Sequence, residues 1–373
     1  MVYTKFIGVA MKYLIINSVV GCGSTGKIVY NLYNKLVAEG NQCVVAWGRT
    51  NTVNDEIATY RIGTKIDLAV HLLKARLFDT QGFESKHATR KFVKWIGDYK
   101  PDIIWIHNIH GYYINLEILF NYIKINNIKV IWTLHDCWAF TGHCAYFSYS
   151  KCDKWKDGCY NCINKINYPA SYLCDNSKRN FQKKKDTFTG VNDLKIIVPS
   201  RWLKGLVEES FLNEYPIEVV YNKIDYSIYK PTASDFRKKN KLENKKIILG
   251  VASPWSSRKG LSDFVRLSET IEDDYRIVLV GLTKKQIKKL PSRIIGLEKT
   301  DSAQKLAALY TMADVYLNLT YEDNYPTTNL EAQACGTPCI TYNTGGSVES
   351  VTSDNVVEQG NMEMLIAKIK ELC

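Results

Sequence analysis

The stretch from Tyr321 to Gly346, YEDNYPTTNLEAQACGTPCITYNTGG, carries more information about this chain than any other segment. It sets two acidic residues, Glu322 and Asp323, in a turn and then opens a helix with a third carboxylate, Glu331. A short apolar run and a pair of glycines follow. Carboxylates accept bonds from hydroxyl groups, a helix start offers free backbone N–H groups, and glycines allow close backbone approach. Together these groups suit a sugar that is joined to a phosphate.

Short apolar runs alternate with amphipathic helical stretches along the whole chain, which is typical of parallel α/β architecture. The 373 residues are enough for two domains that each bury a core. The predicted fold class is α/β, with two doubly wound, Rossmann-like domains that face a central cleft. The expected strands are Tyr13–Asn17, Cys43–Trp47, Ile103–His107, Val130–Leu134, Lys195–Val198 and Ile217–Val220, then Lys246–Val251, Arg276–Val280, Val315–Leu319 and Pro338–Tyr342.

The segment 321–346 also resembles the donor-site signature of retaining glycosyltransferases of the family 4 type (glycosyl transferases group 1), which have the GT-B fold. In that signature two glutamates bracket seven residues ahead of an A-x-A-C-G-x-P-V run. Asp323 stands eight positions before Glu331, in the place of the first glutamate, and Glu322 is one residue further away. The resemblance implies that Asp323 or Glu322 positions the sugar hydroxyls and that Glu331 contacts the ribose. It implies further donor contacts from Pro326, Thr327, Thr328, Gly345 and Gly346.

Glu331 has a structural alternative, because Thr328 and Glu331 fit a capping box in which the glutamate satisfies a backbone N–H at the helix start. The expected domain boundary lies between residues 230 and 231. By the resemblance, residues 1–230 form an acceptor-side domain with a cysteine-rich insertion at 137–174, and residues 231–373 bind the nucleotide-sugar donor. The last helix, Met362–Leu372, is expected to pack back on the first domain.

A basic element follows the first strand of the second domain. The sequence PWSSRKG from Pro254 to Gly260 resembles the R-x-x-x-x-K-G element of the same family, whose cations neutralise the donor diphosphate. Lys259 matches, Pro254 stands in place of the arginine, and Arg258 is the candidate for the second charge. Solvated cations at a helix start would oppose the helix dipole, so an anionic ligand explains them better.

A glycine-rich loop, GCGSTGKI from Gly21 to Ile28, follows the first strand. It nearly matches the phosphate-binding loop of P-loop NTPases, but Ile28 replaces the hydroxyl that would hold Mg²⁺. The resemblance makes Gly23, Ser24 and Gly26 donor- or acceptor-contacting residues. The alternative is a simple strand-to-helix turn that Ser24 or Thr25 caps.

Histidines follow two of the expected strands. His135 and Asp136 end the strand KVIWTLHD, and ligands of open parallel sheets gather at the carboxyl ends of strands. Similar proteins have a histidine here that contacts the donor sugar. His107 and His110 end the preceding strand and are weaker candidates for the same site.

Eleven cysteines in a chain without the plan of a signal peptide argue against a disulfide scaffold. A structural zinc site is one interpretation of the C-x-x-C pair and its neighbours, and buried thiols or a redox pair are the alternatives. Cys137, His143 and Cys174 are possible substitute ligands. With its HD-x-W-x-F-T-G opening, this stretch resembles an insertion in bacterial exopolysaccharide glycosyltransferases and is expected to shape acceptor binding. The predicted zinc ligands are Cys144, Cys152, Cys159 and Cys162.

The net charge of +11 has two interpretations, solvated helix faces or attraction to anionic lipid head groups. Nucleic acid is not expected as a partner, because the basic clusters lack interleaved aromatic residues. The chain holds no apolar run of roughly 18–20 residues, the length that a membrane span requires. We therefore expect a cytoplasmic protein at the inner face of the membrane, with Met11 as an alternative start.

The resemblance implies a glycosyltransferase of the EC 2.4 class that moves a sugar from a nucleoside diphosphate to a glycan acceptor with retention of configuration. The expected acceptor is lipid-linked, and the expected process is cell-surface polysaccharide biosynthesis. No metal is expected at the reaction centre, since the chain has no D-x-D motif and its cations can stabilise the departing diphosphate. The alternative is a non-catalytic scaffold that binds a glycan or a partner protein through the cysteine-rich insertion.

Overall fold

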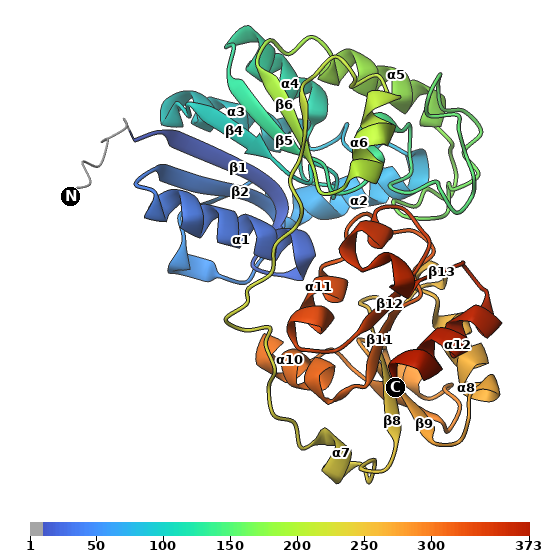
Figure 1. Cartoon of the computed structure of the whole chain (residues 1–373). Helices are drawn as coiled ribbons and strands as arrows, with labels where there is room; N and C mark the ends of the chain where they lie inside the picture. Colours follow the sequence, from blue (N-terminus) through green and yellow to red (C-terminus); the bar gives the residue numbers. More distant parts are fainter. Residues whose placement is uncertain (1–9) are drawn as a thin grey trace. The chain divides into compact units, whose positions relative to one another are not determined.

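The computed structural model describes residues 10–373, so residues 1–9, which belong to the segment ahead of the alternative start at Met11, lie outside the described part of the chain. The chain divides into two compact units, Met1–Val220 (unit 1) and Tyr221–Cys373 (unit 2), which Figure 1 shows in blue to green and in yellow to red. The division falls ten residues before the expected boundary at 230/231. Each unit contains its own parallel sheet with helices packed against it.

Unit 1 is built on a seven-stranded parallel sheet in the order β3-β2-β1-β4-β5-β6-β7. The strand order reverses between β1 and β4, which marks the switch point where doubly wound sheets bind ligands. The strands are β1 (Lys12–Val20), β2 (Gln42–Asn51), β3 (Thr59–Arg61), β4 (Ile103–Ile106), β5 (Lys129–Thr133), β6 (Leu194–Val198) and β7 (Ile217–Val219). The helices are α1 (Gly23–Ala38), α2 (Lys65–Phe78), α3 (Lys86–Tyr99), α4 (Leu116–Ile125), α5 (Ser177–Phe188) and α6 (Arg201–Glu208).

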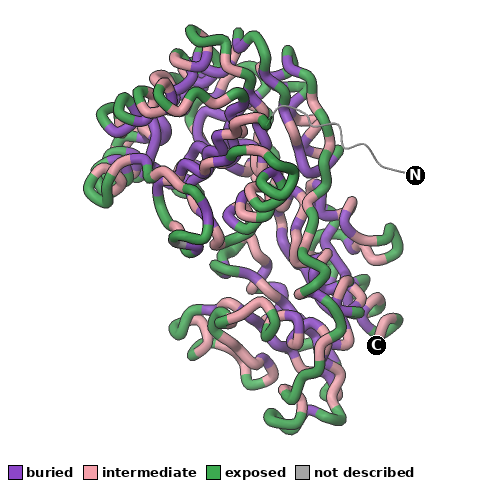
Figure 2. The backbone as a smooth tube through the Cα atoms, turned by 90° about the vertical axis from the view of Figure 1, so that its left-hand side faces the viewer, coloured by how far each residue is buried: buried purple, intermediate pink, exposed green. Residues whose placement is uncertain are grey.

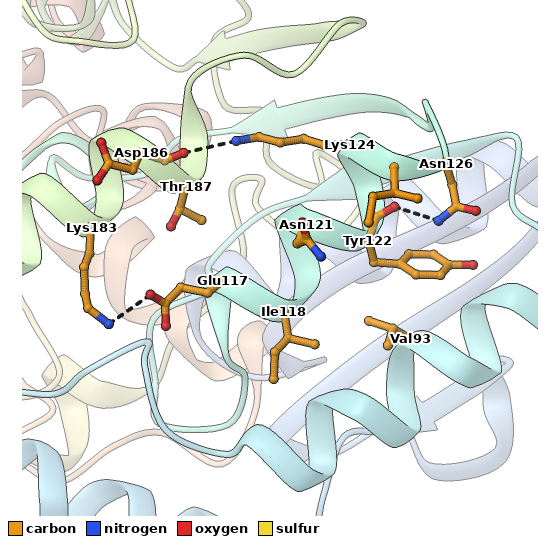
Figure 3. A pocket seen from close by; sticks show the side chains of 11 residues that line it. Val93, Glu117, Ile118, Asn121, Tyr122, Lys124, Asn126, Lys183, Asp186 and Thr187 are labelled. Atoms are coloured by element: carbon orange, nitrogen blue, oxygen red, sulfur yellow. Dashed lines mark hydrogen bonds and ion pairs between the residues drawn. The ribbon is translucent and has the colours of Figure 1, made fainter.

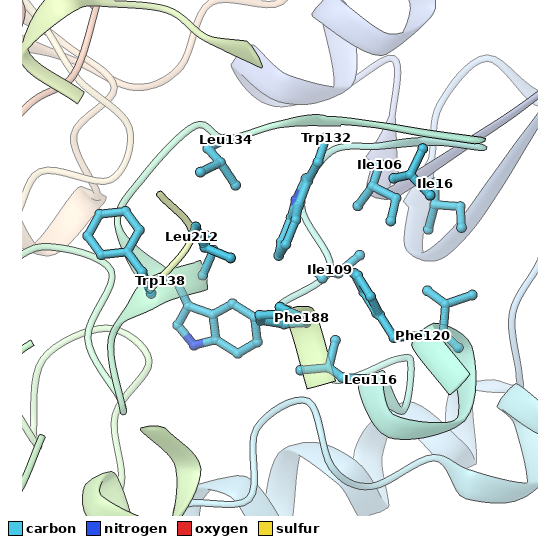
Figure 4. Packing of buried hydrophobic residues seen from close by; sticks show 14 of the residues in the cluster. Ile16, Ile106, Ile109, Leu116, Phe120, Trp132, Leu134, Trp138, Phe188 and Leu212 are labelled. Atoms are coloured by element: carbon cyan, nitrogen blue, oxygen red, sulfur yellow. The ribbon is translucent and has the colours of Figure 1, made fainter. Parts of the chain in front are cut away.

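The central strands of unit 1 are apolar on both faces because helices cover both sides of a parallel sheet. Figure 4 shows Ile16 of β1, Ile106 of β4 and Trp132 of β5 meeting Phe120 of α4 and Phe188 of α5. The Phe188 ring lies 4.7 Å from the Phe120 ring and 4.8 Å from the Trp132 ring, centroid to centroid. This aromatic cluster anchors α5 to the sheet, although its lysine-rich sequence had not indicated a helix with a buried face.

Unit 2 has a six-stranded parallel sheet in the order β10-β9-β8-β11-β12-β13, with its switch point between β8 and β11. Its strands are β8 (Lys246–Val251), β9 (Tyr275–Val280), β10 (Ile294–Leu297), β11 (Val315–Asn318), β12 (Cys339–Tyr342) and β13 (Val356–Val357). Its helices are α7 (Phe236–Lys239), α8 (Leu261–Thr270), α9 (Lys284–Ile287), α10 (Ala303–Met312), α11 (Thr327–Ala334) and α12 (Met362–Leu372).

The last helix, α12, packs in the core of unit 2, where Leu365 and Ile369 lie among its buried residues. Its apolar stripe is thus covered within unit 2, and the expectation that the helix also packs back on the first domain stays a prediction. Figure 2 shows buried stretches running through the interior of each unit and exposed stretches in the turns around them.

Every expected strand is present, and the sheets contain three further strands, β3, β10 and β13. Each of these three lies at the edge of its sheet and spans two to four residues. Such short edge strands have one neighbour and no long apolar run, so hydrophobic periodicity does not reveal them. No helix in the described part of the chain has the length and apolarity needed to cross a membrane.

Candidate active site

The basic element of unit 2 is positioned by a glycine. After β8 the chain forms a short 3₁₀ helix, Ser257–Lys259, and Gly260 then turns it into α8 with a φ of 71°. A Cβ atom on Gly260 would lie 2.1 Å from the carbonyl oxygen of Leu319, just after β11. Only glycine permits both this approach and this φ, so the end of β8 is held against the end of β11.

This approach brings Lys259 to the predicted acids. Its Nζ lies 2.7 Å from Oδ2 of Asp323, while the Arg258 guanidinium donates to the carbonyl oxygen of Glu322. Burial lowers the pKa of Lys259, and Asp323 opposes that shift in part. Burial alone would raise the pKa of Asp323, but Lys259 and Arg258 outweigh it and hold that pKa below its ordinary value. The pair is therefore charged, and the Asp323 carboxylate meets the basic element at Lys259.

The start of α11 lies on the same edge of the sheet. Pro326 precedes the helix, and no side chain caps the N–H groups of its first turn. Asn329 fixes this turn, because its side chain accepts a bond from Asn318 of β11 at 2.9 Å and donates one to Ser350 at 2.9 Å. The first N–H groups, including those of Thr327 and Thr328, are thus held rigidly where a helix dipole favours an anion.

Glu331 lies one turn into α11, and its Oε2 accepts a hydrogen bond from the Tyr310 hydroxyl at 3.0 Å. The capping-box interpretation of Thr328 and Glu331 is wrong, because the residue that precedes the helix is Pro326 and no side-chain cap is formed. The carboxylate is buried, and a tyrosine of α10 orients it.

The paired glycines complete this edge. Gly345, with a φ of 50°, and Gly346 follow β12 and lead into the 3₁₀ helix Ser347–Ser350. Beside them the Ser347 hydroxyl is fully buried and has no hydrogen-bond partner within residues 10–373. Buried hydroxyls are normally satisfied, so this orphan group marks a place where a ligand oxygen would be bonded.

In unit 1 the glycine loop directly follows β1. Cys22 precedes α1 and no side chain caps this helix, so the alternative in which Ser24 or Thr25 is the cap is wrong. A Cβ atom on Gly26 would lie 3.2 Å from Val19 Cγ2, and one on Gly23 would meet nothing within 4 Å. Gly26 is therefore needed for close packing of the helix on the strand, whereas Gly23 faces open space.

The histidines of unit 1 meet at the ends of β4 and β5. His107 Nδ1 lies 2.9 Å from His135 Nε2, with the rings stacked at 5.2 Å between centroids. Burial lowers the pKa of His135 to about 4 and that of His107 well below its ordinary value. Both imidazoles are thus neutral at pH 7, and one donates to the other.

A second histidine cluster lies beside the first. His110 Nε2 lies 3.0 Å from Asp136 Oδ2, and His110 Nδ1 lies 3.0 Å from the hydroxyl of Tyr168. Burial would raise the pKa of Asp136, but His110 outweighs it and the net pKa is lowered. Tyr168 belongs to the cysteine-rich segment, so this chain of bonds ties that segment to the strand ends. The sequence made His110 a weaker candidate for the site, but the structure places it between Asp136 and Tyr168 in this chain of hydrogen bonds.

The four predicted zinc ligands of the cysteine-rich segment are free thiols in the structure. Cys159 Sγ accepts a hydrogen bond from the Gly142 N–H at 3.1 Å. The free thiols of Cys144 and Cys162 form a hydrogen bond with each other. Within residues 10–373 no three His, Cys, Asp or Glu side chains are gathered so that they could hold a metal ion. Three of the four predicted ligands, Cys144, Cys159 and Cys162, thus have hydrogen-bond partners within the protein.

Lys184 of α5 is a residue that sequence reasoning missed. Its buried Nζ donates to the carbonyl oxygens of Trp138 and Thr141, at 2.6 and 2.9 Å, and lies 3.4 Å from the Trp138 ring. Burial lowers the pKa of this ammonium to about 7. The lysine fixes the start of the cysteine-rich segment after His135 and Asp136. The only signal for it was the apolar spacing of its neighbours Phe181 and Phe188.

A hollow of about 610 Å³ lies elsewhere on unit 1, among helices α3, α4 and α5 (Figure 3). Its polar groups are paired with one another: Lys183 bonds Glu117 at 2.9 Å, and Lys124 bonds the Asp186 carbonyl at 3.1 Å. None of the predicted site residues lines it. The strand ends of the two sheets, rather than this hollow, are the candidate sites.

Both units match known families. Residues 25–227 match the family described as Glycosyltransferase Family 4, and residues 232–373 match Glycosyl transferases group 1. The chain is a group 1, family 4-type glycosyltransferase. The two family matches are separated by residues 228–231.

Two curated relatives cover parts of the chain. The putative colanic acid biosynthesis glycosyl transferase WcaC of Escherichia coli is 38% identical over 74 residues, 18% of each chain. The processive diacylglycerol alpha-glucosyltransferase of Acholeplasma laidlawii is 30% identical over 172 residues, 43% of this chain and 51% of that protein. The matches thus span at most about half the length of these relatives.

Solved structures match over nearly the whole chain. Sucrose-phosphate synthase from Thermosynechococcus elongatus gives a TM-score of 0.67 at 15% identity, covering 97% of this chain and 89% of that one. Anabaena HepE in complex with UDP gives 0.66 at 15% identity with the same coverage. These likenesses establish the two-domain GT-B fold.

Proposed function

We propose that the chain transfers a sugar from a nucleoside diphosphate to a lipid-linked glycan acceptor with retention of configuration, in cell-surface polysaccharide biosynthesis. The observation that carries the proposal is the convergence of Arg258, Lys259 and the uncapped start of α11 at the switch point of unit 2. Two cations and a helix dipole at one sheet edge suit a diphosphate. HepE, which has the same fold, was crystallised with UDP.

In this mechanism Lys259 and Arg258 neutralise the diphosphate as the bond between it and the anomeric carbon breaks. The acceptor oxygen bonds the anomeric carbon on the same face, and its proton passes to the departing phosphate. Asp323 accepts bonds from sugar hydroxyls, Glu331 binds the ribose and His135 contacts the sugar. Phosphate oxygens accept hydrogen bonds from the first N–H groups of α11 and from the Ser347 hydroxyl. Gly345 and Gly346 let the backbone approach the phosphates closely. No metal ion is assigned to the reaction centre.

We further propose that the acceptor is lipid-linked and that the protein works at the cytoplasmic face of the membrane. The relative in Acholeplasma laidlawii is named as a diacylglycerol glucosyltransferase, and WcaC is named for colanic acid biosynthesis. Neutral His107 and His135 with the His110–Asp136 pair provide groups for uncharged hydroxyls in unit 1.

Structural zinc in the cysteine-rich segment stays a prediction. One feature favours it: His143 Nδ1 is bonded to Asp79 at 2.6 Å, and its buried Nε2 has no partner within residues 10–373. Metal analysis of the purified protein tests it. One zinc per chain, lost in the Cys162→Ser variant, would support the prediction, and well under one would exclude it.

The proposed transfer is tested with sugar nucleotides of different bases and a membrane extract that supplies lipid-linked acceptors. We expect label from one sugar nucleotide to enter the lipid fraction in the presence of EDTA. Failure with every donor would contradict the proposal.

A further inference from the structure

Helix α2 of unit 1 turns its apolar residues outward. Ile66, Val70 and Leu73 lie at i, i+4 and i+7, so they form one stripe along the helix. Ile66 is 76% exposed and Leu73 is 58% exposed. The opposite face carries His71 and Ala75, which are buried. A helix that packs only on its own domain would bury its apolar stripe and expose its polar residues.

The buried histidine shows that this orientation is fixed. His71 Nδ1 lies 2.8 Å from the Ser85 hydroxyl, and His71 Nε2 accepts the Gly82 N–H at 3.3 Å. Burial lowers the pKa of His71 to about 3, so the ring is neutral. A capping box between Thr64 and Asp67 fixes the helix start. Rotating α2 to bury its apolar stripe would break these bonds.

A second exposed apolar segment adjoins α2. The Tyr172 N–H donates to the Arg76 carbonyl at 2.7 Å, and the Arg76 guanidinium lies 5.6 Å from the Tyr172 ring. Next to Tyr172, Leu173 is 65% exposed, and Ile166 in the same segment is 71% exposed. We name this surface the outer apolar patch; it consists of Ile66, Val70, Leu73, Ile166, Tyr172 and Leu173.

Exposed apolar side chains are concentrated at this place. Of the eighteen large apolar or aromatic side chains exposed in the described part of the chain, five lie on α2 and six lie in residues 160–173. Single exposed apolar residues need no explanation, but a concentration of them on two adjoining segments marks an interaction surface.

Basic residues lie near both ends of α2. At one end of α2, Asp67 lies within electrostatic range of His87 and Lys91 of α3, whose outer face also exposes Lys86, Arg90 and Lys94. At the other end, the Asn176 side chain donates to the Phe78 carbonyl at 2.6 Å, which places the exposed Lys178 and Arg179 of α5 nearby.

The neighbouring carboxylates are already engaged. Asp67 belongs to the capping box, and Glu84 pairs with Lys74 at 3.0 Å. Asp175 accepts the N–H groups of Cys162 and Ser177. Asp67 and Asp175 keep their negative charge, but the six exposed lysines and arginines named above outnumber them, so the net charge around the outer apolar patch is positive.

We propose that the outer apolar patch docks unit 1 on an anionic lipid bilayer. An apolar stripe with a basic border enters the boundary between head groups and acyl chains, while its cations meet lipid phosphates. A protein partner would not require cations at both ends of α2. This proposal rests on the proposed function for its purpose, since Tyr168 of the same segment bonds His110 at 3.0 Å and so joins the docking face to the acceptor-side strand ends.

The test is flotation of the purified full chain with vesicles. We expect binding to phosphatidylcholine vesicles that contain about 30% phosphatidylglycerol and weak binding to pure phosphatidylcholine, because the cations need anionic lipid. The triple variant Ile66→Ser, Val70→Ser, Leu73→Ser should lose binding by about tenfold or more. Arg90→Glu with Lys91→Glu should lose the preference for the anionic lipid.

Matched controls use similar residues that do not belong to the outer apolar patch. Ile125→Ser with Val37→Ser changes two other exposed apolar residues, and Lys285→Glu with Lys289→Glu changes exposed cations of unit 2. Both should bind like the wild type. No vesicle binding by the wild type, or equal loss in the controls, would overturn the proposal. A wild-type dimer that the triple variant abolishes would instead assign the patch to a second copy of the chain.

Vesicle binding needs no donor, so its outcome is separate from that of the proposed function. Nucleotide-dependent stabilisation of the triple variant shows whether it is folded, because none of its three substitutions lies at a strand end. Loss of vesicle binding with this stabilisation retained would support the docking surface even if no transfer were found with any donor.

Discussion

The two sheets present different chemistry at their carboxyl edges. The edge of unit 2 is charged, with Lys259 held by Asp323 at 2.7 Å beside Arg258 and an uncapped helix start. The edge of unit 1 is mainly neutral, with imidazoles whose pKa is lowered by burial and an Asp136 that is already bonded. The same Rossmann-like architecture therefore carries a charged edge in unit 2 and a mainly neutral edge in unit 1, and we propose that the first binds the diphosphate and the second binds hydroxyl groups.

The largest expected effect comes from removing the cation of unit 2. Lys259→Ala should lower transfer by about 10²–10³-fold with the fold intact, since it removes a charge that stabilises the departing diphosphate. Labelled transfer and melting temperature are the measurements, and Lys285→Ala on the exposed side of α9 is the matched control. Wild-type transfer in Lys259→Ala would remove this residue from the mechanism.

The partner of Lys259 separates binding from transfer. In Asp323→Asn the cation loses its internal counter-charge, so affinity for the nucleoside diphosphate should stay the same or rise. Transfer should fall by roughly tenfold to a hundredfold, because the contact with the sugar hydroxyls is lost. Calorimetric titration beside the transfer assay resolves the two effects. A parallel fall in affinity would show instead that Asp323 only holds the lysine in place.

An acid of unit 1 should behave differently. Asp136→Asn replaces the carboxylate that bonds His110 with a weaker acceptor. His110 and its hydrogen bond to Tyr168 are then held less firmly, so transfer should fall by about tenfold. Nucleotide affinity should not change, because this residue is assigned to the hydroxyl-binding edge. Asp193→Asn, an exposed carboxylate paired with Lys129, is the control. A loss of nucleotide affinity in Asp136→Asn would contradict the assignment of nucleotide binding to unit 2 alone.

The architecture could be predicted because long buried strands such as β1 and β8 are continuous apolar runs. The charged edge of unit 2 could be predicted because Lys259 and Asp323 both follow expected strands and Gly260 directly follows Lys259. The contact between Lys259 and Asp323, 64 residues apart, required the close approach at Gly260. The burial of Lys184 could not be predicted, because the sequence of a basic helix does not distinguish a buried lysine from a solvated one. The Tyr310–Glu331 hydrogen bond could not be predicted either, because no sequence spacing identifies a tyrosine as the partner of a carboxylate.

The smallest expected effect concerns pH. The folded protein keeps His135 neutral, with its pKa at about 4, whereas the unfolded chain protonates it near the ordinary value of 6.5. The unfolded state therefore binds more protons, and stability should fall as the pH drops from about 6.5 to about 4. The melting temperature of His135→Gln should fall by a few degrees less than that of the wild type over this range. An identical fall in both would contradict the buried neutral ring.

The central claim is that the charged edge of unit 2 binds the nucleoside diphosphate of the donor. The most direct measurement is the melting temperature of the wild type and of Lys259→Ala with UDP, GDP, ADP or Mg-ATP, because a ligand that binds only the folded state raises it. We predict that UDP or GDP stabilises the wild type in EDTA and that Lys259→Ala largely loses this shift. Stabilisation by Mg-ATP alone, or an equal shift in Lys259→Ala, would contradict the claim.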